Sequence, residues 1–269
     1  MPNVHLITFG DGSKEYIDAA QRLIRESNNF DSIDHRRSFG LKDLGVEYEK
    51  LFKESVRFSP KGLGLFAWKP FLISQELASI DENDILIYMD SGFELNVKGT
   101  HRFDDYLSIT SEQQALTFEL QHPQRYWTKR SSVLTESHQE HKYRNQIAAG
   151  IIFLKKTKLT KKFCDDWLWI SSYNGGETLE DPQPLERQIS GFKSHRHDQS
   201  TLSLAVYIND IYHIKDETYF NNWSDALHYP VLALRNKSAQ QQHPRLLGNF
   251  QRIKNSIREA KLNYRTRKK

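Results

Sequence analysis

The chain has 269 residues with 38% hydrophobic side chains, a length that can bury a sizeable core in one large α/β domain, alone or with an extension. Its net charge is +4, and much of that excess lies at the C-terminus. The rest of the chain is nearly balanced in charge, which argues against a dedicated nucleic-acid-binding protein.

The cysteine content and the hydropathy of the chain indicate the cellular compartment in which the protein is expected. Cys164 is the only cysteine, which excludes a disulfide within the chain and a cysteine-based zinc site and fits a reducing environment. The first residues lack the basic and apolar regions of a signal peptide, and no apolar run approaches the length of a membrane span. We therefore expect a cytoplasmic protein.

The first segment predicts the opening of an α/β unit. Residues 4–9 are rich in β-forming side chains and end at Gly10-Asp11-Gly12, and an amphipathic pattern follows Ser13, a suitable N-cap. The turn lacks the three spaced glycines of a dinucleotide fingerprint. It either lets a nucleotide approach the backbone or simply closes a tight turn.

Residues 32–39 predict a second short strand, and residues 41–56 predict a helix. Arg36, in the strand, could face a phosphate, although such a residue is ordinarily solvated. The next predicted helix has Pro70 in its first turn, where proline is well tolerated. Lys69 would then lie at the positive end of that helix and form an anion site, or else point into solvent.

The apolar run at residues 84–92 predicts a buried strand that ends at Asp90-Ser91-Gly92. In open α/β sheets, ligands bind outside the carboxyl ends of such strands. Asp90 is therefore the first candidate for chemistry, although many buried strands end in such a sequence only because a turn follows.

The middle of the chain continues the α/β pattern. Gly150 lies inside a predicted strand, where glycine often marks the close approach of a ligand or another backbone segment. His138 and His141 have a spacing that a metal could use, but no carboxylate pattern accompanies them. The elements expected here are a short helix at 103–107, strands at 114–120 and 146–154, a polar-aromatic loop at 126–130, a helix and loop at 129–145, and a helix at 158–173.

A second polar cluster, residues 195–200, precedes another apolar helix pattern. Asp198 is a suitable N-cap for that helix. Either it does only this, or Asp198 and Gln199 project into a cleft beside the strand that ends at Asp90. The tail, residues 246–269, predicts a basic amphipathic helix that could lie on an anionic membrane surface or pack on the domain. We divide the chain into residues 1–245 and 246–269.

These motifs together resemble bacterial glycosyltransferases of the GT-A fold, over roughly residues 4–210. The likeness is greatest to polysaccharide and O-antigen biosynthesis enzymes, including a group that transfers galactofuranose, and Asp198-Gln199 is similar to a pair in glycogenin-like retaining families. The resemblance implies one GT-A-like α/β domain, with a mixed, mostly parallel central sheet flanked by helices. The matching segments are residues 7–12, 64–70, 84–92, 149–156 and 195–199.

GT-A enzymes normally carry Asp-x-Asp at the end of the central strand, where it holds a divalent cation on the donor diphosphate. The resemblance therefore implies Mn²⁺ or Mg²⁺, hard ions that suit carboxylate ligands and neutralise a leaving diphosphate. Here the second aspartate is replaced by Gly92. Asp90 would hold the metal with Glu94 or a histidine such as His213 or His243, or Lys and Arg would replace part of its charge.

The resemblance also implies roles for other residues. Asp198, with His197 and Gln199, would be catalytic, either as the base of an inverting enzyme or beside the anomeric carbon of a retaining one. Trp127 and Lys129 would line the sugar or acceptor side. The expected nucleotide contacts are Thr8, Phe9, Gly10 and Asp11, and the expected diphosphate contacts are Arg36 and Lys69. Ser91 and Gly92 are expected among the residues that bind the nucleotide-sugar donor.

The function implied is transfer of a sugar from a nucleotide-diphosphate sugar, with a UDP-sugar favoured, to a glycan or lipid-linked acceptor in cell-surface polysaccharide synthesis. One alternative is a nucleotidyltransferase, although that class needs a longer Gly-rich, basic loop than Gly10-Asp11-Gly12 provides. The other is a non-catalytic sugar-binding domain, against which the polar groups at strand and helix ends argue.

Overall fold

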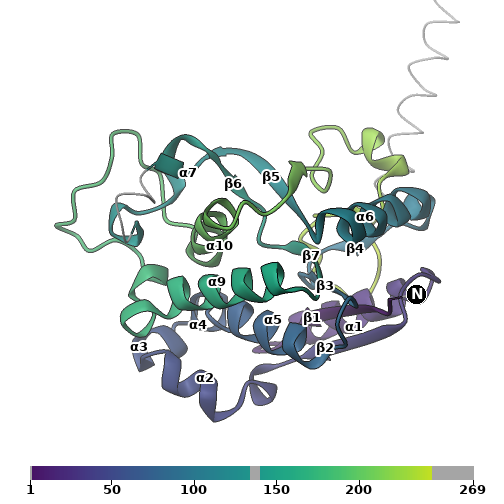
Figure 1. Ribbon diagram of the computed structural model, residues 1–269, viewed down its shortest axis with the longest axis horizontal. Coiled ribbons are helices and arrows are strands. Elements are labelled where there is room, and N and C mark those ends of the chain that lie inside the picture. The colour runs from purple at the N-terminus through teal and green to yellow at the C-terminus, as the bar shows by residue number, and fades with distance from the viewer. Residues whose placement is uncertain (1, 134–139, 244–269) are drawn as a thin grey trace, which may run out of the picture.

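The computed structural model describes residues 2–133 and 140–243, which form layers of helices around a central sheet (Figure 1). The strands are β1 (Val4–Phe9), β2 (His35–Phe39), β3 (Ile85–Met89), β4 (Glu94–Leu95), β5 (Ala115–Pro123), β6 (Asn145–Ile147), β7 (Ile151–Lys155), β8 (His213–Lys215) and β9 (Val231–Leu232). The α-helices are α1 (Lys14–Ser27), α2 (Gly45–Leu51), α3 (Glu54–Arg57), α4 (Gly62–Leu65), α5 (Trp68–Ser79), α6 (Thr100–Gln113), α7 (Gln124–Trp127), α9 (Lys158–Gly176) and α10 (His197–Ile208).

The main sheet has the order β2-β1-β3-β7-β5-β6, and β8 also pairs with β5. Strands β1, β2 and β3 are parallel, β7 is antiparallel to both β3 and β5, β6 is antiparallel to β5, and β8 is parallel to β5. Strands β1, β2, β3, β5 and β8 thus share one direction, and β6 and β7 oppose it. This confirms the expected α/β class with a mixed, mostly parallel sheet.

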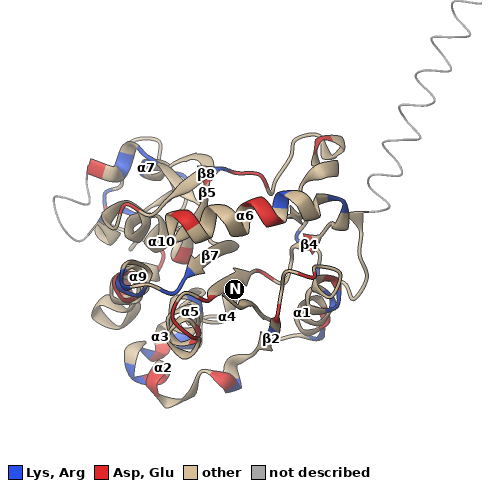
Figure 2. Cartoon of the chain, turned by 45° about the vertical axis from the view of Figure 1, so that its right-hand side comes forward, with Lys and Arg blue, Asp and Glu red and all other residues tan. Residues whose placement is uncertain are grey.

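Each face of the sheet is buried by helices, because the central strands are apolar on both sides. All five residues of β3 are buried. One core lies under α5, α9 and α10 and includes Trp167, and a second lies under α1 and α6 and includes Phe103. Figure 2 shows α1 and α5 on opposite sides of the parallel strands.

The helix expected at residues 41–56 is broken. A 3-10 turn at Leu41–Asp43 is followed by α2 and α3 as separate short helices. Gly45 has a φ of +69°, which interrupts the helical path. Phe52, between α2 and α3, is extended and buries its ring, so tertiary packing overrides the helical pattern there.

The strand expected at residues 146–154 is interrupted at residues 148–150. Both of its parts, β6 and β7, pair with β5. The interruption brings the backbone of Ala149 and Gly150 to the end of β3, where the Gly150 carbonyl accepts a hydrogen bond of 2.8 Å from the Asp90 backbone N–H. The predicted close approach at Gly150 is confirmed: a Cβ there would lie 2.6 Å from the Phe93 ring and 3.0 Å from Asp90 Oδ2.

The C-terminal part of the described chain returns to the carboxyl end of β3. Strand β9 pairs with β4, and residues 235–243, here called the C-terminal strap, pack against α1 and the loop after Asp90. Arg22 joins these parts by donating to the carbonyls of Ser91 and Asn236.

None of the helices in the described residues is long and apolar enough to cross a membrane. The predicted tail helix at 246–269 and the boundary at 245 lie outside the described residues.

Candidate active site

Lys69, in the first turn of α5, is the centre of the site. Its ammonium lies 3.1 Å from Asp90 Oδ1 and 2.7 Å from Asp198 Oδ2, and it donates to the Ala149 carbonyl at 3.1 Å. A lysine has three N–H donors, so these contacts occupy all of them. Lys69 is only 2% exposed, and the structure therefore uses it between two carboxylates and not as a free anion ligand.

The two carboxylates differ in their surroundings. The Asp90 side chain is 39% exposed and accepts a 2.5 Å hydrogen bond from the Tyr88 hydroxyl. Burial and the neighbouring Asp90 carboxylate raise the pKa of Tyr88 well above its usual value, so this phenol remains a donor. The Asp198 side chain is only 8% exposed. One carboxylate therefore faces solvent, and the other is enclosed.

Burial raises the pKa of Asp198 above its ordinary 3.8, although the ammonium of Lys69 opposes this change. For Lys69, burial alone would lower the pKa, but the carboxylates of Asp198 and Asp90 outweigh burial and raise it. Lys69 is thus a fixed cation, while Asp198 is a buried carboxylate whose proton is held more tightly than usual. A poised buried carboxylate of this kind is typical of general-base sites.

The start of α10 differs from the expectation in one respect. Arg196 is the N-cap, and Asp198 lies in the first turn with its side chain turned to Lys69, so the N-cap prediction for Asp198 is wrong. Gln199 donates to the Gln146 side chain at 2.6 Å. His197 donates from Nδ1 to the Leu179 carbonyl, and its buried Nε2 has no hydrogen-bond partner among the described residues. Burial lowers the pKa of His197, which favours the neutral ring.

The residues expected at the nucleotide lie at the carboxyl end of β1, the same sheet edge as Asp90. The Phe9 ring stacks on Trp68 at 3.8 Å within the core, and the Thr8 side chain is fully buried. Gly10 is required by packing, because a Cβ there would lie 2.4 Å from the Tyr16 carbonyl oxygen. Asp11 accepts the backbone N–H groups of Gly12 and Leu41, so it joins the two loops. Of these four residues, only Gly10 and Asp11 are partly exposed.

The structure does not bring Arg36 to the site. In the parallel register it lies opposite Leu6, well before the carboxyl end of β1. Its guanidinium donates to the carbonyls of Ser27 and Phe30 at the end of α1. The sequence could not show this, because the position of a strand residue along the sheet depends on register.

Ser91 and Gly92 connect Asp90 to the C-terminal strap. Ser91 is buried, and the Gly92 carbonyl accepts the Asn236 N–H at 2.8 Å. A Cβ at Gly92 would lie 3.3 Å from Arg235 Cα. A side chain at position 92 would thus crowd the strap backbone, which would have to shift by a few tenths of an ångström, and this favours glycine at this position. Arg235 is exposed, with a φ of +54°, a strained conformation for a residue other than glycine.

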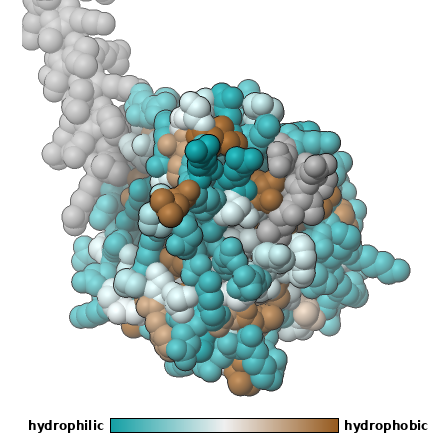
Figure 3. Space-filling model, turned by 90° about the vertical axis from the view of Figure 1, so that its left-hand side faces the viewer, coloured by the Kyte–Doolittle hydropathy of each residue, from teal (hydrophilic) through white to brown (hydrophobic). Residues whose placement is uncertain are grey.

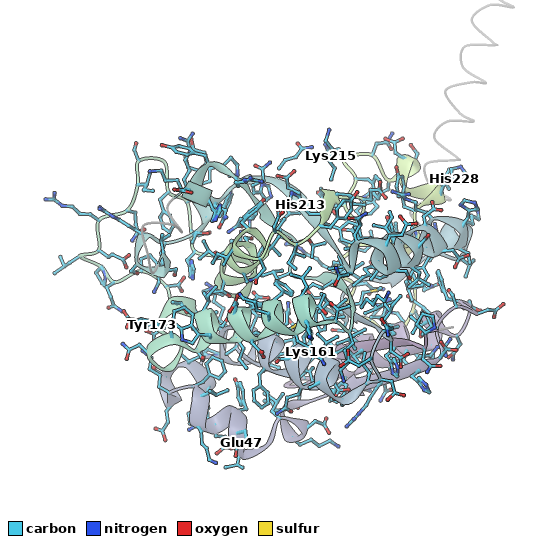
Figure 4. All side chains as sticks on the ribbon, viewed as in Figure 1. Glu47, Lys161, Tyr173, His213, Lys215 and His228 are labelled. Atoms are coloured by element: carbon cyan, nitrogen blue, oxygen red, sulfur yellow. The ribbon has the colours of Figure 1, made fainter. Side chains whose placement is uncertain are left out.

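Glu94 does not join Asp90. Its fully buried carboxylate accepts from Asn236, from the backbone N–H groups of Gln242 and His243, and from His243 Nδ1 at 2.8 Å. His213 lies on β8 (Figure 4), where its Nδ1 contacts the Ile211 carbonyl. Within residues 2–133 and 140–243, no three His, Cys, Asp or Glu side chains gather as a metal cluster. Asp90 is the one predicted metal ligand with a partly exposed carboxylate at the site.

On the predicted sugar side, Trp127 is half-buried, and Arg196 lies 4.2 Å from the centre of its ring. Lys129 is buried instead, with its Nζ donating to the Glu177 carbonyl at 2.7 Å, and burial lowers its pKa. Lys129 therefore holds two loops together.

Three residues of the site were not predicted from the sequence. Tyr88 precedes Asp90 by two residues, and this period-2 spacing was an available signal that both lie on one face of the strand. Ala149 acts through its backbone carbonyl, which carries no sequence signal. Arg235 is brought beside Gly92 by the strap, a contact between residues far apart in the chain.

No known family and no curated protein sequence matches the chain. It is similar in structure to a glycosyltransferase involved in glycosylation of the major capsid of PBCV-1 (10% identity, TM-score 0.46, 93% of this chain and 99% of that chain) and to mouse xyloside xylosyltransferase 1 (11%, 0.45, 84% and 90%). It is also similar to 4-diphosphocytidyl-2C-methyl-D-erythritol synthase from Anaerococcus prevotii (10%, 0.32, 77% and 98%). At these TM-scores the likenesses carry no conclusion about function.

Proposed function

We propose that the protein is a glycosyltransferase that uses a nucleoside diphosphate sugar as donor. The observation that carries this proposal is the buried Lys69 ammonium held between Asp90 and Asp198 at the carboxyl edge of a mixed α/β sheet. Ligand sites of open α/β sheets lie at this edge. The two carboxylates differ in exposure, which suits two different tasks.

In this proposal Asp198 acts on the reacting sugar. Its burial raises the pKa and favours proton uptake, and the fixed charge of Lys69 opposes this and favours the ionised form. As a base it would take the proton of the acceptor hydroxyl while that oxygen attacks the anomeric carbon. In a retaining reaction the same carboxylate, beside Gln199, would stabilise positive charge on the sugar ring instead.

Asp90 would serve the diphosphate. Its carboxylate is partly exposed, and Lys69 and Tyr88 contact Oδ1, which leaves Oδ2 toward Gly150. This donor set fits Mn²⁺ or Mg²⁺ only if the diphosphate and water supply the remaining ligands. When bound, such an ion neutralises charge on the leaving diphosphate. Arg235, exposed beside Gly92, would add a positive charge where a GT-A enzyme has its second aspartate.

The finer assignments belong to the same proposal. We favour a UDP-sugar donor, with galactofuranose or another hexose as the sugar, and a glycan or lipid-linked acceptor in cell-surface polysaccharide synthesis. The basic tail at 246–269 would hold the enzyme on the inner face of an anionic membrane.

Calorimetric titration with UDP-, GDP-, CMP- and dTDP-sugars, with and without Mn²⁺, tests the proposal. At least one donor should bind, and Asp90→Ala should weaken that binding while the thermal unfolding midpoint stays close to that of the wild type. If no donor binds under either condition, the transferase proposal is wrong.

A further inference from the structure

A group of cations stacked on aromatic rings lies beside the candidate active site. Helix α7 carries Arg125, Tyr126 and Trp127, all partly exposed. The Arg125 guanidinium lies 4.5 Å from the centre of the Tyr126 ring and 5.6 Å from that of Tyr143. Tyr143 is 67% exposed. The Arg125 guanidinium also donates to the Tyr126 hydroxyl at 2.5 Å, so it is held beside the rings while its side chain stays partly exposed.

A second stack continues the first. Arg196 and Lys193 both lie over the Trp127 ring, at 4.2 and 5.2 Å from its centre. We call the six residues Arg125, Tyr126, Trp127, Tyr143, Lys193 and Arg196 the basic-aromatic surface. Figure 3 looks onto the end of the molecule that holds α7, and hydrophilic residues predominate there, with isolated hydrophobic ones between them.

Among the described residues, no acidic side chain pairs with the cations of this surface. Within the described part of the chain, none of the three cations Arg125, Lys193 and Arg196 has an Asp or Glu oxygen within 4.0 Å, whereas exposed lysines elsewhere, such as Lys53 and Lys61, do. One Arg125 nitrogen donates to the Tyr126 hydroxyl, and the other N–H donors of a guanidinium beside a ring suit carboxylate and phosphate groups.

The surface is built by the backbone and is not a chance meeting of long side chains. The Lys193 N–H donates to the Tyr126 carbonyl at 2.8 Å. Gly191 has a φ of +83°, and a Cβ there would lie 2.8 Å from the Tyr126 ring, so this segment lies directly against the tyrosine. Order of this kind lowers the entropic cost of binding.

Hydrogen bonds connect the surface to the active site. The Trp127 carbonyl accepts from the Arg196 N–H at 3.0 Å and from the Gln146 side chain at 3.2 Å. Gln146 in turn accepts from Gln199, the neighbour of Asp198. Arg196 is the N-cap of the helix whose first turn carries Asp198. The surface is therefore joined to the first turn of α10, which carries Asp198, through the Trp127 carbonyl and the Gln146 side chain.

From this geometry we infer that the basic-aromatic surface binds an anionic saccharide, one that carries carboxylate or phosphate groups, and that this is the acceptor. That the saccharide is the acceptor rests on the proposed function, whereas the binding of an anionic saccharide to this surface does not. The rings would pack against the apolar faces of sugar rings, and the cations would pair with the anionic groups. A single-stranded nucleic acid could stack on the same rings. The hydrogen-bonded connection between this surface and the proposed sugar-transfer site favours the saccharide.

The test measures binding of oligogalacturonate, phosphorylated dextran and an uncharged maltooligosaccharide to the full chain by calorimetry, at low and raised salt. Wild-type protein should bind at least one anionic saccharide, more weakly as salt rises, and should not bind the maltooligosaccharide. The carboxylate and phosphate arms identify the anionic group. Arg125→Gln/Lys193→Gln should weaken this binding about tenfold.

Lys42→Gln/Lys158→Gln is the matched control, since it removes the same charge at exposed positions outside the surface. Thermal unfolding checks that both double variants are folded. Equal loss of affinity in the two double variants, absence of anionic saccharide binding, or tighter binding of a single-stranded oligonucleotide would each overturn the inference. A donor titration of the same sample separates the two claims: donor binding without saccharide binding contradicts the inference alone.

Discussion

Lys69 fixes the properties of the site at the scale of single residues. It is almost fully buried, yet it is charged, because two carboxylates and a carbonyl satisfy its three donors. Removing one member of a buried ionic group leaves the remaining charges unpaired, which costs more than the group contributes as a whole. If Lys69 is removed, water can solvate the partly exposed carboxylate of Asp90 but not the buried carboxylate of Asp198.

Lys69→Met should therefore lower the free energy of unfolding by about 3–5 kcal/mol and abolish donor turnover. In Lys69→Met/Asp198→Leu the buried carboxylate is also removed, so most of the stability should return while activity stays absent. Urea denaturation and a donor-hydrolysis assay measure the two effects. If the double variant is no more stable than the single one, Asp198 is not the carboxylate that depends on Lys69.

The pH dependence of activity should show the raised pKa of Asp198. Activity needs the carboxylate, so kcat/KM should fall as pH decreases through a pKa above the ordinary value of 3.8. The same shift means that ionising Asp198 costs folding free energy, a cost that is absent below its unfolded pKa. A pH–rate profile with donor binding measured at each pH checks this prediction. Constant kcat/KM down to pH 4 would contradict it.

Residue types at strand and helix ends were enough to select Lys69, Asp90 and Asp198, since buried strands and helices rarely end in charge without a partner. They were not enough to pair them. Lys69 and Asp198 are far apart in sequence, and only the packing of α5 and α10 on one face of the sheet brings them within 2.7 Å. Arg36 and Glu94 were wrongly predicted to lie at the site. Both are polar residues close in sequence to site segments, but their hydrogen bonds only stabilise the fold.

At the scale of elements, the interruption between β6 and β7 shapes the site. It directs the Ala149 carbonyl to Lys69 and places Gly150 against Asp90. The sequence predicted a strand with a glycine inside it but not the break, because apolar residues continue on both sides. Likewise, the positive φ of Gly45 and the packing of Phe52 divide the helix expected at 41–56.

Gly150→Ala should impair activity more than stability. Its Cβ would meet the Phe93 ring and approach Asp90 Oδ2 to 3.0 Å, so the carboxylate has to move. We expect the free energy of unfolding to fall by about 1–3 kcal/mol. The affinity for the donor, measured by calorimetry, should also be lower than that of the wild type. Gly45→Ala is a suitable control, since the φ of +69° strains alanine there and the space around it is open. Equal donor affinity in both variants would show that Gly150 does not position Asp90.

At the scale of the whole molecule, the chain closes on itself at the carboxyl end of β3. Glu94 holds the C-terminal strap through contacts with Asn236, Gln242 and His243. Burial alone would raise the pKa of Glu94, but the hydrogen bonds from His243, Gln242 and Asn236 outweigh burial and lower it. The ionised carboxylate therefore stabilises the folded state above its unfolded pKa, and this stabilisation is lost as pH falls through its folded pKa.

Glu94→Gln should consequently lower the free energy of unfolding at pH 7 by about 2–4 kcal/mol. The difference from the wild type should shrink as pH falls toward the folded pKa of Glu94, where the wild-type side chain is also neutral. Urea denaturation over a pH series measures both effects. A difference that does not change with pH would mean that loss of packing, not of charge, is responsible.

The central claim is that Asp198 performs chemistry on a bound nucleoside diphosphate sugar, and hydrolysis of the donor that binds in the calorimetric panel tests it most directly. Wild-type protein should release the nucleoside diphosphate slowly without acceptor. Asp198→Asn should bind the same donor with nearly unchanged affinity and release the nucleotide about 10²–10⁴-fold more slowly, whereas Asp31→Asn, at an exposed carboxylate away from the site, should match the wild type. Turnover by Asp198→Asn at the wild-type rate would contradict the account.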